Sequence, residues 1–394
     1  MPLEMADLLV GTLLFIALVI GWLLGKSERK KPVVTDTVTP LGKEYFQGLN
    51  LLLNEKQDEA MELLLKTLDV NRDTFDTYLV MGTLYRRRGE VDRSIRIHQD
   101  LLARPNISKL QQSTVRLELA RDYLKAGLLD RSERLLKELA EETGANQVVA
   151  LEFLLSIYEL ENDWKAAVQT AEKLAAKGKQ VAVNLAHYHC EQAQHCMQVG
   201  DLVEARRELK DALHADRNSV RASLLQAELE SKAGNEKEAI KALRRVLEQD
   251  PDYIPETLPL LRQNYEKAGQ LGELVKFLFT CLEQHPAISV VIELSSLVRQ
   301  LEGDKAGAYV LSEYLKKRPT VRGLDRLIQY HMDNTEGPAR ENLGLLQAFT
   351  QRLIQDKPVY RCGKCGFNGK TLHWQCPSCK TWSSIKPIHG IEGE

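Results

Sequence analysis

The sequence has few aromatic residues, few prolines and almost no net charge. Aromatic residues, which favour β-strands, make up 6% of the 394 residues, and only 13 are proline, so the composition favours helices. The 53 Lys and Arg nearly balance 55 Asp and Glu, which argues against a protein whose whole surface binds nucleic acid. Seven Cys, an odd number, do not suit a secreted disulfide framework. The composition indicates a large helical protein kept in a reducing compartment.

Catalytic signatures are also missing. The sequence holds no HExxH zinc-protease motif, no Walker phosphate loop, no GxSxG nucleophile elbow and no dinucleotide-binding fingerprint. We therefore predict that the protein is not an enzyme.

One long apolar run lies near the start of the chain. Residues 8–25, LLVGTLLFIALVIGWLLG, carry no charge, and 18 helical residues reach about 27 Å, close to the hydrocarbon thickness of a bilayer. A cleaved signal peptide or a buried helix is also apolar, but a signal peptide has positive charges before the run, whereas Glu4 and Asp7 precede this one. The basic residues follow it: Lys26, Arg29, Lys30 and Lys31. We predict residues 1–25 as a single transmembrane anchor with its C-terminal flank in the cytoplasm.

Residues 26–40 are predicted as a basic flank and linker. Pro32 and Pro40 bracket a β-branched stretch, PVVTDTVTP, which suits an extended segment. We expect the chain beyond it to lie in the cytosol, where unpaired cysteines stay reduced.

Residues 41–356 are predicted to form internal repeats. A Gly or Asn that closes one helix is followed five positions later by a small residue in the next helix; the pairs are Gly89/Ser94, Gly127/Ser132, Asn162/Ala167, Gly200/Ala205, Gly234/Ala239 and Gly303/Ala308. An aromatic residue often stands four positions before the turn, as do Tyr85, Tyr123, Tyr158 and Tyr265. The spacing, 34 to 38 residues over most of the array, is typical of the tetratricopeptide repeat, a helix–turn–helix unit of about 34 residues.

The predicted fold class is all-α, a superhelical solenoid of about eight repeats with capping helices near residues 324–355. Some positions depart from the pattern: Glu55 replaces the turn glycine in repeat one, and Leu274 replaces the small residue in repeat seven. No repeat buries its apolar face alone, so stacking makes the core continuous. The first helix of each repeat is expected to form a concave inner surface of the kind that binds proteins or peptides.

Helical phase places six charged side chains on that inner surface. The candidate partner-binding residues are the basic Arg86, Arg87, Arg121 and Lys125 and the acidic Glu152 and Glu159. The alternative is that these are ordinary solvated charges. Residues 32–356 carry 43 basic and 50 acidic side chains, so we expect no nucleic-acid partner.

Repeat five contains an unusual group of His and Cys residues. His187, Glu191 and His195 recur at four-residue spacing on one helical face, where a metal ion is conceivable. Cys196 falls where a repeat places its packed aromatic, and Cys190 falls on the inner lining. Because buried Cys behaves as a small hydrophobe, we favour packing over metal binding.

The strongest motif lies in residues 357–394. Cys362 and Cys365 form one C-x2-C pair and Cys376 and Cys379 another, with ten residues between them. Two such pairs build a four-thiolate tetrahedral site for one metal ion, and zinc and iron both accept these ligands. So short a segment can barely bury a core, so the metal is expected to supply folding energy.

The knuckles CGKCGF and CPSC resemble those of rubredoxin and zinc ribbons. Rubredoxin has a longer stretch between its pairs and a fuller aromatic core, which argues against electron transfer. Phe367, Trp374 and Trp382 are expected to cover the site or to dock it against the last helices.

An N-terminal anchor, a repeat array and a terminal YRCxKCGF…HWxCPSC…WSxIKPI segment together resemble the LapB (YciM) family of bacterial lipopolysaccharide assembly proteins. The resemblance implies an adaptor in the inner membrane, with the N-terminus periplasmic and the bulk of the chain cytoplasmic. It implies three partners: the deacetylase LpxC as client, the membrane protease FtsH, and the opposing membrane regulator PbgA (YejM). Homo-oligomerisation is left open. Two other functions remain as alternatives, a redox protein built on the rubredoxin-like tail and a general peptide-binding co-chaperone.

Overall fold

A computed structural model describes residues 15–23, 47–48, 50–51, 59–60, 63, 75–105, 107–355, 357–391 and 393. The chain divides into two compact units, Met1–Pro105 and Asn106–Glu394. Residues 15–23 are helical, whereas the rest of the predicted anchor and the linker at 26–40 lie outside the described residues. Within the described ranges, no helix is both long and apolar enough to cross a bilayer.

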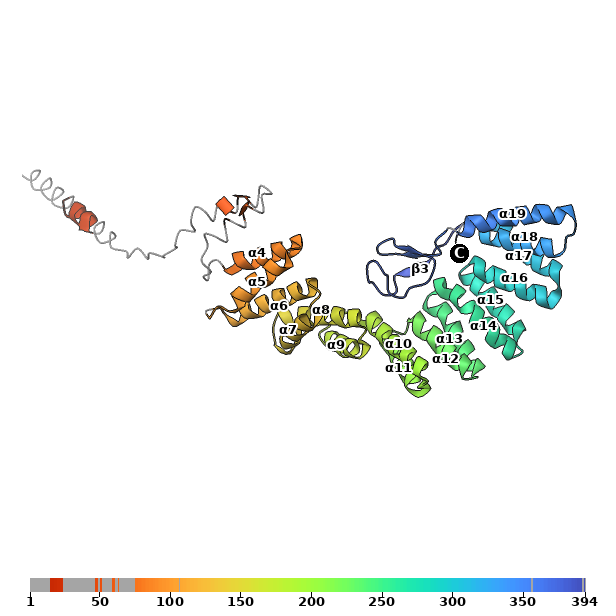
Figure 1. The fold of residues 1–394 in the computed structure, drawn as a ribbon, viewed down its shortest axis with the longest axis horizontal. Coiled ribbons are helices and arrows are strands. Elements are labelled where there is room, and N and C mark those ends of the chain that lie inside the picture. Colours follow the sequence, from red (N-terminus) through yellow and green to blue (C-terminus); the bar gives the residue numbers. More distant parts are fainter. Residues whose placement is uncertain are drawn as a thin grey trace, which may run out of the picture. The chain divides into compact units, whose positions relative to one another are not determined.

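The described residues of the repeat region are almost entirely helical, and sequential helices pack as antiparallel pairs (Figure 1). In the first unit, α4 (Phe75–Arg88) pairs with α5 (Val91–Leu102). The second unit contains α6 (Lys109–Lys125), α7 (Leu129–Glu141), α8 (Asn146–Glu161), α9 (Trp164–Ala176), α10 (Ala182–Val199), α11 (Leu202–Ala215), α12 (Val220–Lys232), α13 (Glu236–Gln249), the 3₁₀ turn η2 (Pro251–Tyr253), α14 (Ile254–Lys267), α15 (Leu271–Gln284), α16 (Ile288–Glu302), α17 (Asp304–Lys317), α18 (Val321–Asp333) and α19 (Pro338–Gln355). This is the predicted all-α tetratricopeptide-repeat architecture. The predicted domain limits themselves stay predictions.

Each predicted turn residue ends the first helix of its pair with a left-handed backbone. Gly200, for example, has φ +86°, and Asn162 has φ +57° with its N–H bonded to the Tyr158 carbonyl. A glycine has no Cβ to clash in this conformation, and Asn tolerates it better than most residues. The predicted glycines at 89, 127, 234 and 303 share a positive φ, and so does Gly269 at the turn of repeat seven.

The small residues of the second helices lie fully buried where paired helices approach. Ala167, Ala205 and Ala239 have no exposed surface. Ser94 and Ser132 are equally buried and donate hydrogen bonds of 2.7 and 2.8 Å to carbonyls twelve residues earlier in the first helix. Both hydroxyls therefore satisfy their polar atoms inside the contact.

Repeat eight differs from the prediction by one position. The close approach falls on Gly307, where an added Cβ would lie 2.7 Å from the Ser295 carbonyl, whereas the neighbouring Ala308 is only partly buried. Because Gly307 and Ala308 are both small, the sequence pattern alone did not show which of them lies at the close approach. In repeat seven, Leu274 occupies the small-residue position and is completely buried, so this pair accommodates a larger side chain.

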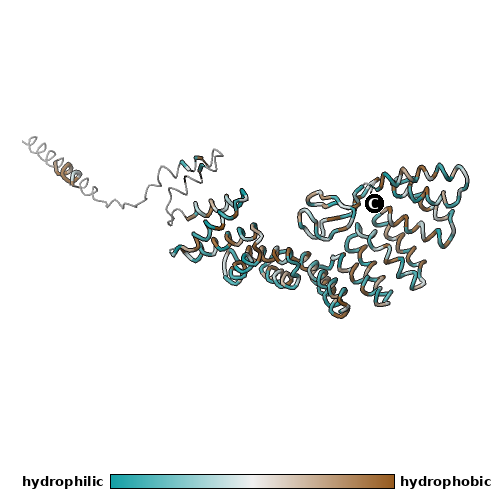
Figure 2. The backbone as a smooth tube through the Cα atoms, viewed as in Figure 1, coloured by the Kyte–Doolittle hydropathy of each residue, from teal (hydrophilic) through white to brown (hydrophobic). Residues whose placement is uncertain are grey.

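The core runs continuously between neighbouring repeats. One cluster extends from Val220 on α12 to Val298 on α16, and another from Leu117 on α6 to Tyr188 on α10. Figure 2 shows apolar and polar residues interspersed along these helices, as expected when each buries one face and exposes the other. Stacking of successive pairs, rather than any single pair, encloses the apolar surface.

The last part of the chain forms a small three-stranded antiparallel sheet. Its strands are β1 (Tyr360–Cys362), β2 (Asn368–Gly369) and β3 (Ile385–Pro387), in the order β2-β1-β3. In the register, Tyr360 pairs with Gly369 on one side and with Pro387 on the other. We refer to residues 357–391 as the metal domain.

Candidate metal centre

Each C-x2-C pair sits on a tight backbone knuckle. In the first, the Gly366 N–H donates to the Cys362 carbonyl at 3.0 Å, and in the second, the Lys380 N–H donates to the Cys376 carbonyl at 2.9 Å. Gly366 and Lys380 both have a positive φ, of 78° and 56°. The two knuckles thus repeat one geometry, which turns both sulfurs of a pair toward the same point.

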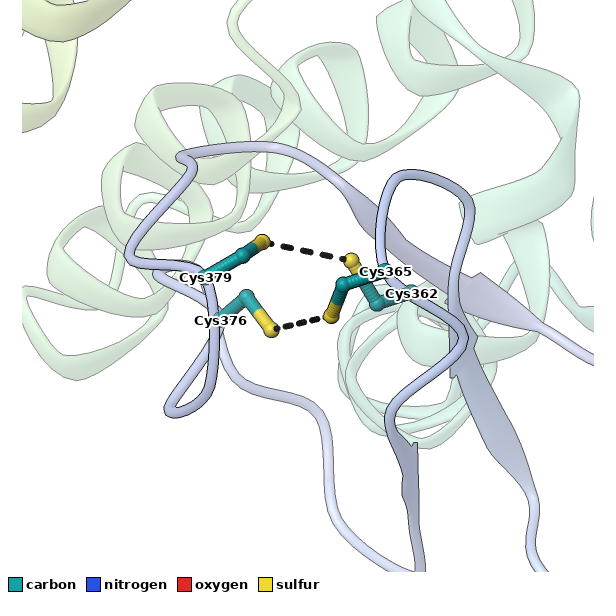
Figure 3. A group of neighbouring side chains, drawn as sticks. All are labelled: Cys362, Cys365, Cys376 and Cys379. Carbon is teal, nitrogen blue, oxygen red and sulfur yellow. Dashed lines mark hydrogen bonds between the residues drawn. The ribbon is translucent and has the colours of Figure 1, made fainter. Parts of the chain in front are cut away.

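The four predicted ligands converge (Figure 3). All four Sγ atoms lie within 4.8 Å of one another, with Cys362 and Cys379 at 3.7 Å and Cys365 and Cys376 at 3.6 Å. Thiolates about 2.3 Å from a tetrahedral metal ion lie about 3.8 Å apart. The donor set therefore fits one tetrahedral ion, with four protein ligands and no open coordination position.

Hydroxyl groups beside two of the sulfurs favour the thiolate. Cys362 Sγ lies 3.3 Å from Ser384 Oγ, and this hydrogen bond, together with backbone N–H groups of the first knuckle, lowers the pKa of Cys362 to about 6. The Thr381 hydroxyl, 3.4 Å from Cys379 Sγ, lowers the pKa of that thiol as well. Since metals bind the deprotonated form, both contacts prepare the site for an ion.

Trp382 joins the metal domain to the repeats. The side chain is 7% exposed, and its ring stacks on the His187 imidazole of α10 at a centroid distance of 4.6 Å. Its Nε1–H donates to Glu159 Oε1 of α8 at 2.9 Å. The Arg221 guanidinium of α12 lies 5.9 Å from the ring centroid. The indole thus contacts α8, α10 and α12 through apolar, hydrogen-bonding and cation–π interactions, and it also lies edge-to-face with Trp164 of α9 at a centroid distance of 6.3 Å.

A second set of contacts is centred on Tyr253 in η2. Its ring stacks on Trp374 at 5.6 Å, and its hydroxyl donates to the Ile385 carbonyl of β3 at 2.7 Å. The Tyr360 hydroxyl of β1 donates to Glu256 of α14. Strands β1 and β3 and the side chain of Trp374 are therefore all tied to the repeats.

The docking position corrects one expectation. Trp374 and Trp382 do not pack against the last helices; they contact η2 and the first helices of the middle repeats. We call the surface formed by Glu159, His187, Arg221, Tyr253 and Glu256 the docking face. Phe367 instead packs beside Cys362 and Cys376 within the metal domain, where the prediction that it covers the site is consistent with its position.

The basic candidate partner-binding residues are at least partly accessible. Arg86 and Arg87 belong to α4 in the first unit, and Arg87 is exposed. On α6, Lys125 is exposed, whereas Arg121 is partly buried and pairs with Glu118 at 2.5 Å. Their role in partner binding stays a prediction.

The two acidic candidates differ in their surroundings. Glu152 is exposed and pairs with Lys179 at 2.8 Å. Glu159 lies in the docking face, where it accepts hydrogen bonds from Tyr188, Gln375 and Trp382. In this arrangement Glu159 holds the metal domain, so any client contact through it requires release of Trp382.

The His and Cys residues of repeat five do not gather around a common point. His187 stacks on Trp382, while Glu191 is ion-paired with Arg221 at 2.9 Å. His195 is exposed and Cys190 is completely buried. Among the described residues, the groups with metal-ligand geometry do not include these side chains. Packing is therefore the correct interpretation for Cys190.

Sequence reasoning missed the residues that hold the metal domain in place. Arg221 is 5% exposed and Tyr253 is 3% exposed, and both look like ordinary helix or turn positions in the sequence. Their partners in the metal domain lie more than a hundred residues away, so no local spacing marks these contacts. The one available signal was the pair of tryptophans in a tail too short to bury them itself.

Two family descriptions match the chain, the rubredoxin metal binding domain over residues 360–387 and the tetratricopeptide repeat over residues 197–263. Lipopolysaccharide assembly protein B of Escherichia coli (strain K12) is 36% identical over 387 residues, which cover 98% of this chain and 99% of that protein. The protein of the same name from Haemophilus influenzae is also 36% identical, over 394 residues, with 98% and 99% covered.

Among solved structures, a tetratricopeptide repeat protein from Parabacteroides merdae is 12% identical and covers 71% of this chain and 99% of its own, with a TM-score of 0.33. The identity to the curated relatives, in contrast, extends through the repeats and the four-cysteine domain alike. The chain therefore belongs to the lipopolysaccharide assembly protein B family.

Proposed function

We propose that the protein is an inner-membrane-anchored cytoplasmic adaptor that regulates lipopolysaccharide synthesis. In this role it presents an LpxC-type deacetylase to an FtsH-type membrane protease for degradation. A PbgA/YejM-type membrane protein opposes it through the anchor at residues 1–25. The names of its relatives support a role in lipopolysaccharide assembly.

The observation that carries the proposal is the docking face. First helices of successive repeats, α8, α10, α12 and α14, already hold one folded element, the metal domain, by buried aromatic, Arg and carboxylate contacts. Aromatic and Arg side chains are the groups that dominate binding at protein interfaces. A surface built in this way suits recognition of a folded protein, such as an enzyme client, better than catalysis.

The metal centre has a structural role in this proposal. We propose one ion, zinc or iron, bound by Cys362, Cys365, Cys376 and Cys379. Four protein ligands complete a tetrahedral shell and leave no position for a substrate. The ion fixes the two knuckles and thereby orients Trp374 and Trp382 toward the repeats.

The test is depletion of the protein in its native host, followed by measurement of the half-life of the deacetylase. The proposal predicts that the half-life lengthens and the enzyme accumulates. An unchanged half-life after depletion would refute the adaptor role.

Complementation then tests the predicted partner surface. Reversal of Arg121 and Lys125 to Glu is expected to leave the deacetylase stabilised, because α6 carries both on the predicted client side. The matched control reverses Lys237 and Lys241 on α13, two exposed lysines of a second helix. If both double variants restore degradation equally, the α6 residues are solvated charges and the client binds elsewhere.

A further inference from the structure

Three potential metal ligands meet where the tail of the metal domain crosses the repeats. Asp252 lies in η2, His285 directly follows α15, and His389 lies two residues beyond β3. None of the three belongs to the four-cysteine centre. Their ligand atoms all lie within 4.8 Å of one another.

The distances fit a common metal ion. Asp252 Oδ1 lies 3.1 Å from His389 Nε2 and 3.3 Å from His285 Nε2. Nitrogen and oxygen ligands about 2.0–2.1 Å from a tetrahedral zinc ion lie about 3.3–3.4 Å apart. Three side chains therefore already occupy positions close to three corners of such a site.

The hydrogen bonds of the cluster leave one ligand atom unexplained. His285 Nε2 is buried and has no hydrogen-bond partner, although Asp252 Oδ1 is near it. A buried polar nitrogen without a partner is costly, so its position calls for an explanation. A metal ion between the three atoms would satisfy it.

Neighbouring groups orient the carboxylate for this role. Lys386 Nζ lies 2.8 Å from Asp252 Oδ2 and 2.8 Å from Asp250 Oδ2, so the lysine engages one oxygen of Asp252 and leaves Oδ1 toward the histidines. The Asp252 N–H donates to Asp250 Oδ1 at 3.2 Å, which fixes the turn. Two carboxylates and one ammonium leave a net negative charge to meet a divalent cation.

We infer that Asp252, His285 and His389 form a second metal site, which takes a zinc ion with two imidazoles, one carboxylate and water as ligands. Imidazole and carboxylate together suit zinc, and three protein ligands suffice for a stable site. Because the three residues come from η2, the end of α15 and the tail after β3, the ion clamps the metal domain to the repeats. Occupancy of this site would then link zinc supply to the stability of the docked state.

Zinc titration of the purified full chain tests the inference. The four-cysteine centre is first filled and excess metal removed by gel filtration, and further Zn²⁺ is then added in a calorimeter. The wild-type chain is expected to bind one additional ion. Loss of a residue that only hydrogen-bonds to a metal ligand typically lowers metal affinity by about 10–100-fold. Loss of a ligand itself, in His285→Gln or His389→Gln, should therefore lower the affinity for the additional ion by more than about tenfold.

Two further variants separate ligation from folding. His389→Arg can still pair with Asp252 through its guanidinium but cannot bind zinc, so we expect a normally folded chain that has lost the additional ion. His214→Gln removes an exposed histidine of α11 and should bind the ion as the wild type does. The inference is overturned if the wild type takes up no ion beyond the four-cysteine centre, or if the His389→Arg chain binds it with unchanged affinity.

Discussion

Replacement of Trp382 by Ala should release the metal domain from the repeats. A buried Trp hides about 150–250 Å² of surface, and loss of such a side chain destabilises by about 3–5 kcal/mol. The indole is 7% exposed and stacks on His187, so we expect nearly the full loss of stabilising free energy here. The lost bond to Glu159 adds little, because Tyr188 and Gln375 still satisfy that carboxylate. The undocked population should therefore rise by a factor of about 10²–10⁴.

Two measurements report this change. Hydrogen exchange of the segment from Trp374 to Ile385 should accelerate, while the metal content stays the same because no ligand is altered. The second readout is the pKa of His187, which is lowered to about 3 by burial and by the neighbouring Arg221. Once the indole leaves, water reaches the imidazole, and NMR titration should show its pKa rising toward the ordinary value of about 6.5.

A matched control separates undocking from general loss of an aromatic side chain. Phe279 on α15 is 49% exposed, and Phe279→Ala should leave both readouts unchanged. If Trp382→Ala also leaves exchange and the His187 titration unchanged, the docking face does not hold the metal domain as described.

Three other perturbations test separate parts of the structure. Cys365→Ser removes one of four thiolates, so metal analysis should show affinity reduced more than about tenfold and exchange protection lost in β1–β3; full metal content would contradict the four-thiolate site. In the unfolded chain His187 takes up a proton below about pH 6.5, whereas in the folded chain it stays neutral down to about pH 3. As the pH is lowered from 6.5, the free energy of unfolding should therefore decrease by about 1.4 kcal/mol for each pH unit. Urea unfolding of His187→Gln should lack that contribution, and His214→Gln, which changes an exposed side chain, should keep it. Deletion of residues 1–25 should give a folded protein without its regulatory effect, and full activity of the truncated chain in cells would show that the anchor is dispensable.

Local signals predicted the repeats well. Turn glycines such as Gly200 and small residues such as Ala205 recur with the period of the repeat. Each is required by the geometry of a single helix pair, the glycine by the turn and the small residue by the close approach of the two helices. The exception is repeat eight, where two adjacent small residues satisfied the pattern and only packing against Ser295 and Arg299 selects Gly307. Here the sequence period predicted the buried position only to the nearest neighbouring residue, and the close contacts between the helices determine which of the two residues is buried.

The metal centre and its docking show where sequence reasoning ends. The spacing of Cys362, Cys365, Cys376 and Cys379 predicted their convergence, because each pair lies on one short knuckle. The contact between Trp382 and His187 joins residues far apart in the chain, and it depends on how the repeats stack. Nothing in either local sequence marks the other as its partner, so the docking position was predicted incorrectly.

The most direct test of the adaptor role is degradation in a reconstituted membrane. An FtsH-type protease in liposomes is mixed with the LpxC-type deacetylase, with and without the full chain described above, and the loss of deacetylase is followed over time. The proposed function predicts that the full chain accelerates degradation. Equal rates with and without it, under conditions in which the protease is active, would contradict the proposal.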